Sequence, residues 1–249
     1  MSIENVRGNY RFIPAGAPFS SGCAASPGFE IVHAALAPMR PLAEGFALVE
    51  SHLKHAGRPL AALCAMQLRL PRVLSAQGFA DFNQPYIEHL RAWGILLDGA
   101  NPVARTNVAL EVNPVAEPML AGFFFTLPAT ASHPSLVLAG SAESRTNQAG
   151  RREIVAANDT SPQGLTLKTE CILEELSRRL ANLDSGWNSM TAVNIYTVHD
   201  IHSVMAATLL PAIGIAGHQG ITWHYARPPV AGLDLEIDAH AVYRQVVIR

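Results

Sequence analysis

Residues 101–128 read NPVARTNVALEVNPVAEPMLAGFFFTLP, and the rest of the chain is best interpreted outward from them. Arg105 stands just before an apolar run with strand-like content, Asn113 and Pro114 indicate a turn, and a second apolar run covers 119–127. We therefore predict two adjacent strands joined by a proline-containing turn. An arginine at the mouth of such a pair suits a carboxylate, although an arginine that only ends a surface loop is the commoner case.

The composition predicts a folded protein with a large core. The chain has 249 residues, of which 49% are hydrophobic and 15% are charged. This length allows one large domain or two small ones. The formal charge is -2 and no run of Lys and Arg occurs, so the sequence gives no electrostatic indication of nucleic-acid binding.

The sequence favours a cytoplasmic location and gives no sign of a membrane segment. The first residues, MSIENVR, are polar and lack the apolar region of a signal peptide. No uninterrupted apolar run reaches the roughly 18 residues that a spanning helix needs. Cys23, Cys64 and Cys171 are far apart and odd in number, which predicts neither a disulfide framework nor a zinc site.

Apolar periodicity predicts four helices, over 42–56, 79–93, 165–183 and 201–210. Proline is tolerated in the first turn of a helix, so Pro85 predicts that the second helix begins only near Gln84. Asp200 is a suitable N-cap for the fourth helix. Apolar runs predict strands before, between and after these helices, including 29–35, 60–70, 190–198 and 233–242, and the residues after Gln245 are expected to continue the last of them.

The order of predicted elements repeats. Strand, helix, strand, helix and strand pair occur once before residue 128 and again after it. A helix-ending glycine recurs at Gly57 and Gly186, and a turn proline at Pro114 and Pro229. We predict two copies of one α+β module, over residues 1–128 and 129–249, with a linker at 129–134.

Short motifs in both copies resemble one known family. No single motif is decisive, but their order along the chain is specific. They are Ser21–Gly22 after an early strand, Phe79, Asn83 and Tyr86 on the second helix, Pro102 to Thr106 around Arg105, and Gly232 to Ala241, which contains Glu236, along the strand predicted over 233–242. Together they resemble the reactive intermediate deaminase family, also called RidA or YjgF-like, in two tandem copies.

The resemblance implies a fold and a chemistry. The fold is a chorismate mutase-like mixed sheet with two helices on one face of each module, assembled as a homotrimer with sites in clefts between neighbouring modules. The chemistry is hydrolysis of an imine or enamine, which releases ammonia and a 2-keto acid without a metal or organic cofactor. In that family an arginine binds the substrate carboxylate and a glutamate helps to position water.

The two copies depart from the family pattern in different ways. The first keeps Arg105 but has Leu120 or Ala121 where the glutamate is expected, whereas the second keeps Glu236 but has Gly220 in place of the arginine. Either a composite site combines Arg105 with Glu236, Glu117 or Glu111, or the pair has lost water activation and only binds metabolites.

The candidate catalytic residues are therefore Arg105, Glu236 and Glu117. The resemblance adds six candidate substrate-binding residues: Tyr10, Ser21, Gly22, Asn83, Tyr86 and Asn107. The predicted substrate is a small carboxylate-bearing imine or enamine. A non-catalytic metabolite-binding protein and a chorismatase-like enzyme are the alternatives.

Three further features are interpreted as structural. His199 and His202 flank Asp200 but lack a third ligand at suitable spacing, so we predict no metal site there. Cys23 is interpreted as a buried cysteine, not a nucleophile, because no histidine partner is indicated. His224 lies on an alternating strand and is expected to be an ordinary surface histidine.

Overall fold

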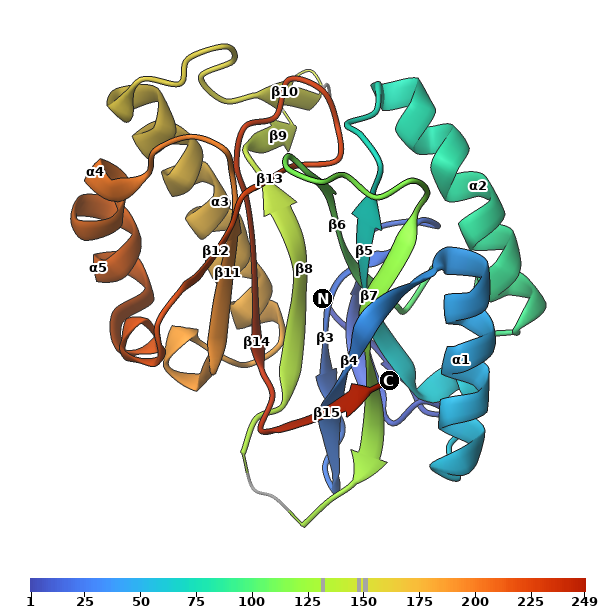
Figure 1. Cartoon of the computed structure of the whole chain (residues 1–249). Coiled ribbons are helices and arrows are strands. Elements are labelled where there is room, and N and C mark those ends of the chain that lie inside the picture. Colours follow the sequence, from blue (N-terminus) through green and yellow to red (C-terminus); the bar gives the residue numbers. More distant parts are fainter. Residues whose placement is uncertain (131–132, 147–148, 150–151) are drawn as a thin grey trace.

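Strands β5 (Leu63–Leu70), β6 (Ala104–Leu110) and β7 (Met119–Pro128) are almost entirely buried. Because both faces are covered, the sequence of β7 is a near-continuous apolar run, whereas β6 carries three buried polar residues, Arg105, Thr106 and Asn107. The computed structural model describes residues 1–130, 133–146, 149 and 152–249. In this part of the chain, these strands lie in the middle of one curled 13-stranded sheet (Figure 1).

The sheet continues from one half of the chain into the other. Its main path is β12-β11-β14-β8-β3-β6-β5-β7-β4-β15, with β1, β2 and β13 attached at the side. The remaining strands of this sheet are β1 (Ile3–Asn5), β2 (Tyr10–Pro14), β3 (Ser20–Ala25), β4 (Phe29–Pro41), β8 (Leu136–Ala142), β11 (Ala192–Tyr196), β12 (Thr222–His224), β13 (Ala226–Arg227), β14 (Glu236–Ala241) and β15 (Arg244–Ile248). Strands β9 (Ser144–Thr146) and β10 (Arg152–Ile154) form a separate two-stranded ribbon.

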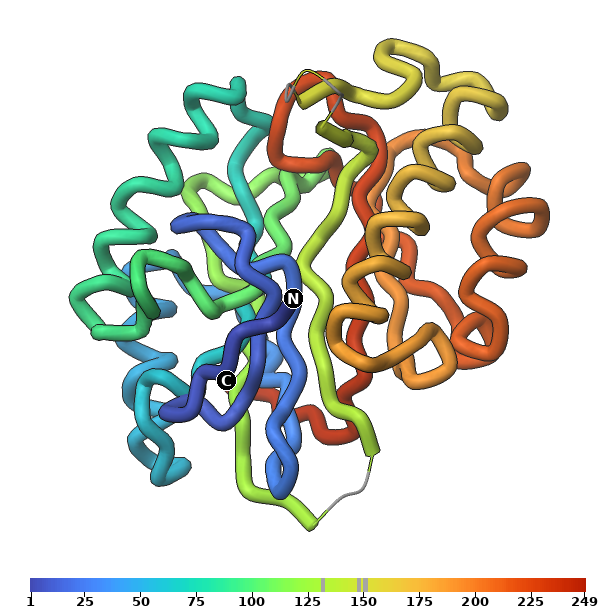
Figure 2. The backbone as a smooth tube through the Cα atoms, turned by 180° about the vertical axis from the view of Figure 1, so that it is seen from behind, coloured from blue at the N-terminus to red at the C-terminus, as the bar shows by residue number. Residues whose placement is uncertain are grey.

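Helices flank the central strands in two groups, as the view from behind shows most clearly (Figure 2). Helices α1 (Leu42–His55) and α2 (Ala76–Ala92) lie on one side. Helix α3 (Pro162–Asn182) and the short helices α4 (His202–Val204) and α5 (Leu210–Ile213) lie on the other. The predicted fourth helix is thus divided, because a π-helical turn over Met205–Leu209 separates α4 from α5. A 3-10 segment over Gly214–Gln219 follows α5.

Each helix group has its own apolar core. The first packs α1 and α2 on their strands through Phe46, Val49, Leu53, Tyr86, Leu90 and Phe123. The second packs α3 to α5 through Ile172, Leu176, Ile195, Leu209, Ile213 and Ile237. In both cases the buried helix residues recur at spacings of three and four, as an amphipathic helix requires.

The strand pairing of the first half recurs in the second. In the first half, β4 and β5 flank β7 antiparallel, and β6 runs parallel to β5. In the second half, β8 and β11 flank β14 antiparallel, and β12 runs parallel to β11. This recurrence supports two copies of one module with a boundary near residue 128, and the division stays a prediction. Two residues of the predicted linker, 131–132, lie outside the described residues.

The prediction that β6 and β7 are adjacent is wrong, because β5 lies between them. Helix α2 connects β5 to β6, and a crossover of this kind places the two strands parallel. The chain then passes over the end of β5 through residues 111–118 and returns as β7, antiparallel to β5. The proline-containing segment therefore connects β6 to β7 across the end of β5, which lies between them.

Two predicted boundaries also differ from the structure. Helix α2 begins at Ala76, not near Gln84, because the Ser75 hydroxyl accepts a hydrogen bond from the Gly78 N–H (3.0 Å) and caps it. Pro85 is tolerated inside this helix on its exposed face, where water can solvate the carbonyl left without a partner. Residues 244–248 do not continue β14 but form β15, which pairs with β4 in parallel.

None of the helices in the described ranges is long and apolar enough to cross a membrane.

Candidate active site

The sheet opens beside β6. This strand pairs with β3 only at Ser20 and Ala104, and with β13 at Ala109 and Leu110. Between these two pairings lie Arg105 and Asn107, whose side chains share one face because strand residues alternate. The opening therefore places two polar side chains of the first half opposite the strands of the second half.

Arg105 is 3% exposed and has unused hydrogen-bonding capacity. Its Nη2 donates to Oδ1 of Asn83 on α2. Its Nε and Nη1 are buried and have no hydrogen-bond partner. Burial lowers the pKa of Arg105 to about 10, so the side chain remains a cation at neutral pH. A buried cation with free donors is costly unless an anion satisfies it.

Aromatic rings surround the Arg105 guanidinium. Its central carbon lies 4.3 Å from the ring centre of Tyr86, 5.1 Å from Phe19, 5.7 Å from Phe82 and 5.8 Å from Phe79. Three of these rings are on α2 at spacings of three and four, which directs them to one helix face. Cation–π contacts of this kind stabilise the charge and keep the guanidinium plane in place without using its N–H donors.

Glu236 contributes the acid of the site from β14. It is 5% exposed, and no described residue donates a hydrogen bond to its carboxylate. Burial first, and then the nearby charges of Asp238 and Glu143, raise the pKa of Glu236 well above its ordinary value, while Arg179 and Arg69 oppose the shift. A glutamate with a raised pKa can hold a proton for donation and later act as a base.

Gly140 makes room for the Glu236 carboxylate. Gly140 lies on β8, and a Cβ atom added there would collide with the carboxylate oxygen Oε1 of Glu236. Its N–H donates to Oγ1 of Thr106 (3.1 Å), which ties β8 to β6 across the opening. The missing side chain at this position therefore lets the acid approach the strand that carries Arg105.

Arg105, Asn107 and Glu236 line one cavity of about 430 Å³. Asn107 is 4% exposed, and its Oδ1 is a further buried atom without a hydrogen-bond partner. The first half also supplies aromatic and apolar walls, and the second half supplies β8, the β9–β10 ribbon and the loop before β14. The other lining residues are Phe19, Ala76, Phe79, Gly140, Ala142, Ser144, Arg152, Ile154, Pro229, Val230, Ala231, Leu233.

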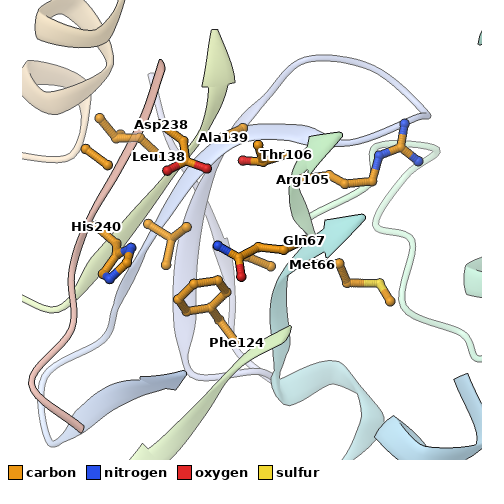
Figure 3. A pocket seen from close by; sticks show the side chains of 12 residues that line it. Met66, Gln67, Arg105, Thr106, Phe124, Leu138, Ala139, Asp238 and His240 are labelled. Atoms are coloured by element: carbon orange, nitrogen blue, oxygen red, sulfur yellow. The ribbon is translucent and has the colours of Figure 1, made fainter. Parts of the chain in front are cut away.

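A second cavity lies where β5 to β8 and β14 face each other, and Figure 3 shows its polar lining. Gln67, Asp238 and His240 contribute side chains to it, whereas the Arg105 guanidinium points away from them. Its volume of about 10 Å³ matches a single water molecule. It is too small for an organic substrate, so we place the candidate site in the larger cavity.

Asn83 and Tyr86 contact Arg105 but are not among the residues that line the cavity. They therefore position the arginine. Ser21 and Gly22 are on β3, likewise outside the lining, and the Ser21 carbonyl accepts from Nη1 of Arg179 (3.3 Å). None of these four residues lines the cavity: Asn83 and Tyr86 hold Arg105, and Ser21 and Gly22 are part of β3.

Three other predicted residues lie away from the cavity. Tyr10 is fully buried in the core, where its hydroxyl donates to the Leu63 carbonyl (2.8 Å), so it has no free group for a substrate. Glu117 is exposed on the loop between β6 and β7. Glu111 is held by two hydrogen bonds from Arg227, at 2.6 and 2.9 Å. Of the three acids considered, Glu236 is the one that lines the cavity with Arg105.

The structure gives each of the three minor candidates a partner. Oδ1 of Asp200 accepts from the N–H of His202 (2.9 Å), but the prediction of Asp200 as N-cap is wrong, because the N-cap of α4 is Ile201. No group of three or more metal-ligating side chains occurs in the described part of the chain. Cys23 is buried, and its Sγ lies 3.4 Å from the Cys64 carbonyl oxygen. His224 is half-buried and stacked on Tyr196, which corrects the prediction of a surface histidine.

The family and the relatives are known from comparison with other proteins. A family model described as 2-aminomuconate deaminase CnbZ matches residues 2–246. A 2-amino-5-chloromuconate deaminase from Comamonas testosteroni is 41% identical over 244 residues, which cover 97% of this chain and 96% of that protein.

One solved structure shows a related fold at low identity, and a second aligns over about half of the chain. A chorismatase crystal structure aligns with a TM-score of 0.51 at 12% identity, over 89% of this chain and 77% of that one. A YjgF/YER057c/UK114 family member from Mycobacterium tuberculosis aligns with 45% of this chain and 82% of its own, at 19% identity and a TM-score of 0.32.

Proposed function

The chain belongs to the 2-aminomuconate deaminase family CnbZ, and from that premise we propose that it hydrolyses an aminomuconate-type enamine in the cavity between its two halves. The single observation that carries this proposal is that Arg105, with two buried donors free, and Glu236 line the same cavity from different halves of one chain. This is the composite site predicted from the sequence, with an arginine from one half and a glutamate from the other. The first half has no glutamate at the family position, and the second half has no arginine there.

In the proposed reaction, Arg105 binds the carboxylate beside the carbon that bears nitrogen. Nε and Nη1 are free, so each can donate a charge-assisted hydrogen bond, and either can bind a carboxylate together with the second N–H of Nη2. The Asn107 amide oxygen, also free of a partner, can accept from the substrate amino group. Holding both groups fixes the reacting carbon near Glu236 and removes much of the entropic cost of the reaction.

Glu236 then transfers protons. Its raised pKa favours the neutral acid, which protonates the enamine carbon and leaves an iminium ion at the neighbouring carbon. The resulting carboxylate takes a proton from water while the water oxygen bonds to the iminium carbon. Glu236, protonated again, gives its proton to the amino nitrogen of the carbinolamine and takes the hydroxyl proton as the C–N bond breaks and the C=O bond forms, so it ends in its starting state. The balance is one enamine and one water consumed, and one 2-oxo acid and one ammonia released, with no redox change.

An assay of ammonia release tests this proposal. Purified protein is mixed with freshly generated 2-aminomuconate, and ammonia and the loss of the conjugated absorbance are followed together. We expect one ammonia per substrate consumed, and a rate that falls sharply in Arg105→Ala. Tight binding without release of ammonia would instead indicate a metabolite-binding protein. Turnover of chorismate would indicate the chorismatase-like alternative, to which the solved chorismatase lends only a shared fold.

A further inference from the structure

A second arginine lines the same cavity as Arg105. Arg152 is the first residue of β10, and its Nε donates to Oγ of Ser144 on β9 (2.8 Å). Both residues are part of the cavity lining. No hydrogen bond joins Nη1 or Nη2 of Arg152 to another described residue. One edge of the guanidinium is therefore anchored and the other is open to an anion.

The ribbon that carries Arg152 is fixed over the cavity. Strand β10 pairs with β9, with Arg152 opposite Thr146. The Val155 N–H donates to the Glu143 carbonyl (2.9 Å), which joins the end of β10 to the end of β8. On the other side, Ile154 packs so closely on Gly232 that a Cβ there would lie 3.2 Å from its methyl carbon. The loop before β14 and the ribbon thus form one wall.

The charges of the cavity match two carboxylates. Its charged lining residues are Arg105, Arg152 and Glu236. Burial resists ionisation of Glu236, which leaves two cations as the dominant charges. A substrate with one carboxylate would satisfy Arg105 alone, whereas a linear dicarboxylate satisfies both arginines.

The distance along the chain from β8 to the start of β9 also suits a dicarboxylate. Gly140 lies beside the acid near Arg105, and Ser144, which anchors Arg152, comes four residues later. At about 3.3 Å per residue these positions are at most about 13 Å apart. A six-carbon dicarboxylate with a hydrogen bond of about 2.8 Å at each end spans a distance of that order.

We infer that Arg152 binds the far carboxylate of a linear dicarboxylic enamine, while Arg105 binds the carboxylate next to the reacting carbon. Arg152 is then a specificity-determining residue, and this inference rests on the proposed function. It explains how one cavity distinguishes a dicarboxylic enamine from the shorter enamines of monocarboxylic amino acids, whose far end is apolar or absent.

The test compares two substrates in matched variants. Arg152→Gln removes the charge and retains most of the side-chain volume. Arg145→Gln is the control, because Arg145 lies on the same ribbon, pairs with Glu153 and is not in the cavity lining. Each variant is assayed for kcat/KM on 2-aminomuconate and on an enamine acid of equal length that carries a methyl group in place of the far carboxylate. Circular dichroism confirms folding.

We expect Arg152→Gln to lose about 5- to 30-fold in kcat/KM on the dicarboxylate, the lower end reflecting its exposure to solvent. On the monocarboxylate it should match the wild type. Arg145→Gln should match the wild type on both, and Arg105→Ala should lose activity on both. An unchanged rate in Arg152→Gln on the dicarboxylate, or an equal loss on the two substrates, would overturn the inference.

If the proposed function is wrong, the experiments give a different set of results. In that case the wild type releases no ammonia from either substrate, and calorimetry with unreactive ligands decides the inference. Muconate should bind more weakly to Arg152→Gln than to the wild type, by about 5- to 30-fold. Sorbate, which has the same chain and one carboxylate, should bind equally to both proteins. Equal binding of muconate to both would refute a role for Arg152.

Discussion

Arg105 and Arg227 provide an internal comparison between a buried arginine and an exposed one. Arg105→Ala removes a cation with two free donors, so we expect a loss of roughly 30- to 1000-fold in kcat/KM. Arg105→Lys should recover little, because an ammonium group lacks the two-pronged geometry. Arg227→Ala breaks only a surface pair with Glu111 and should change the rate little. Steady-state kinetics on folded variants measure all three.

An equal loss in Arg105→Ala and Arg227→Ala would place the active cavity elsewhere. The comparison is informative because the two arginines lie in the same part of the sheet. Arg105 is on β6, and Arg227 is on β13, which pairs with β6. The thermal unfolding midpoint of Arg227→Ala serves as the control for stability, since exposed ion pairs contribute only about 0–1 kcal/mol.

The pH dependence of the rate should report Glu236. Its pKa is raised by burial and by the nearby acids Asp238 and Glu143, so it stays protonated to a higher pH than an ordinary glutamate. Because the protonated form starts the reaction, kcat/KM should be constant below this pKa and fall as the pH rises through it. Glu236→Gln cannot titrate, so its profile should lack this decline, and its rate should be about 100- to 10,000-fold lower.

A rate that instead rises with pH through the same range would show that Glu236 acts first as a base. The substrate must be checked for its own protonation over this range. Ammonia release from 2-aminomuconate without enzyme provides that correction.

Some site residues could be predicted from the sequence and others could not. Arg105 and Glu236 can be predicted because they occupy motif positions that resemble one family, and the structure brings them into one cavity with the candidate Asn107. Phe79, Phe82 and Tyr86 share a helix face by their spacing alone, but nothing in that spacing shows that they surround an arginine. Arg152 has no sequence signal, since its importance comes from contacts between strands that are distant in the chain.

The predictions of element boundaries and strand pairing are wrong where a contact with a distant part of the chain overrides a local preference. Pro85 suggested a late start for α2, yet Ser75 caps the helix before it. The β6–β7 pair looked like a hairpin because the chain between the two runs contains a turn signal. Local signals of this kind cannot show that β5 occupies the position between them.

A buried ion pair holds the loop that forms one wall of the cavity. Nζ of Lys168 on α3 lies 3.3 Å from Oε1 of Glu143 and 2.9 Å from Oδ2 of Asp234, and the first two side chains are fully buried. Lys168→Met leaves Glu143 without its cation, so we expect a loss of about 3 kcal/mol in the free energy of unfolding. Urea unfolding followed by circular dichroism measures this value.

Arg178→Ala is the matched control on the same helix. Arg178 pairs with Glu175 at 2.8 Å, but its side chain is 61% exposed. Its loss should be under about 1 kcal/mol. If both variants lose the same amount, the Lys168 pair contributes no more than a surface pair. Because Asp234 lies between the cavity-lining residues Leu233 and Glu236, Lys168→Met should also raise KM.

The assembly of the protein is a further prediction. Low charge content and the family resemblance led us to expect a homotrimer. In the described chain, β12 lies at one end of the sheet path, and Trp223 and Tyr225 near it are 40% and 54% exposed. Apolar side chains at a sheet edge favour burial against another chain. Light scattering at micromolar concentration should give the mass of three chains of 26.7 kDa each, whereas a stable single-chain mass would contradict the prediction.

Assembly and catalysis should separate on dilution. Arg105, Asn107 and Glu236 line the cavity from one chain, so the composite site needs no residue from a neighbour. The protein is diluted to the concentration at which light scattering or mass photometry reports dissociation. We expect the rate per chain to remain constant over this whole range. A rate that falls in parallel with the mass would show that a neighbouring chain completes or holds the cavity. The control is the thermal unfolding midpoint of the diluted protein. It must stay above the assay temperature, so that a loss of rate reports dissociation and not unfolding.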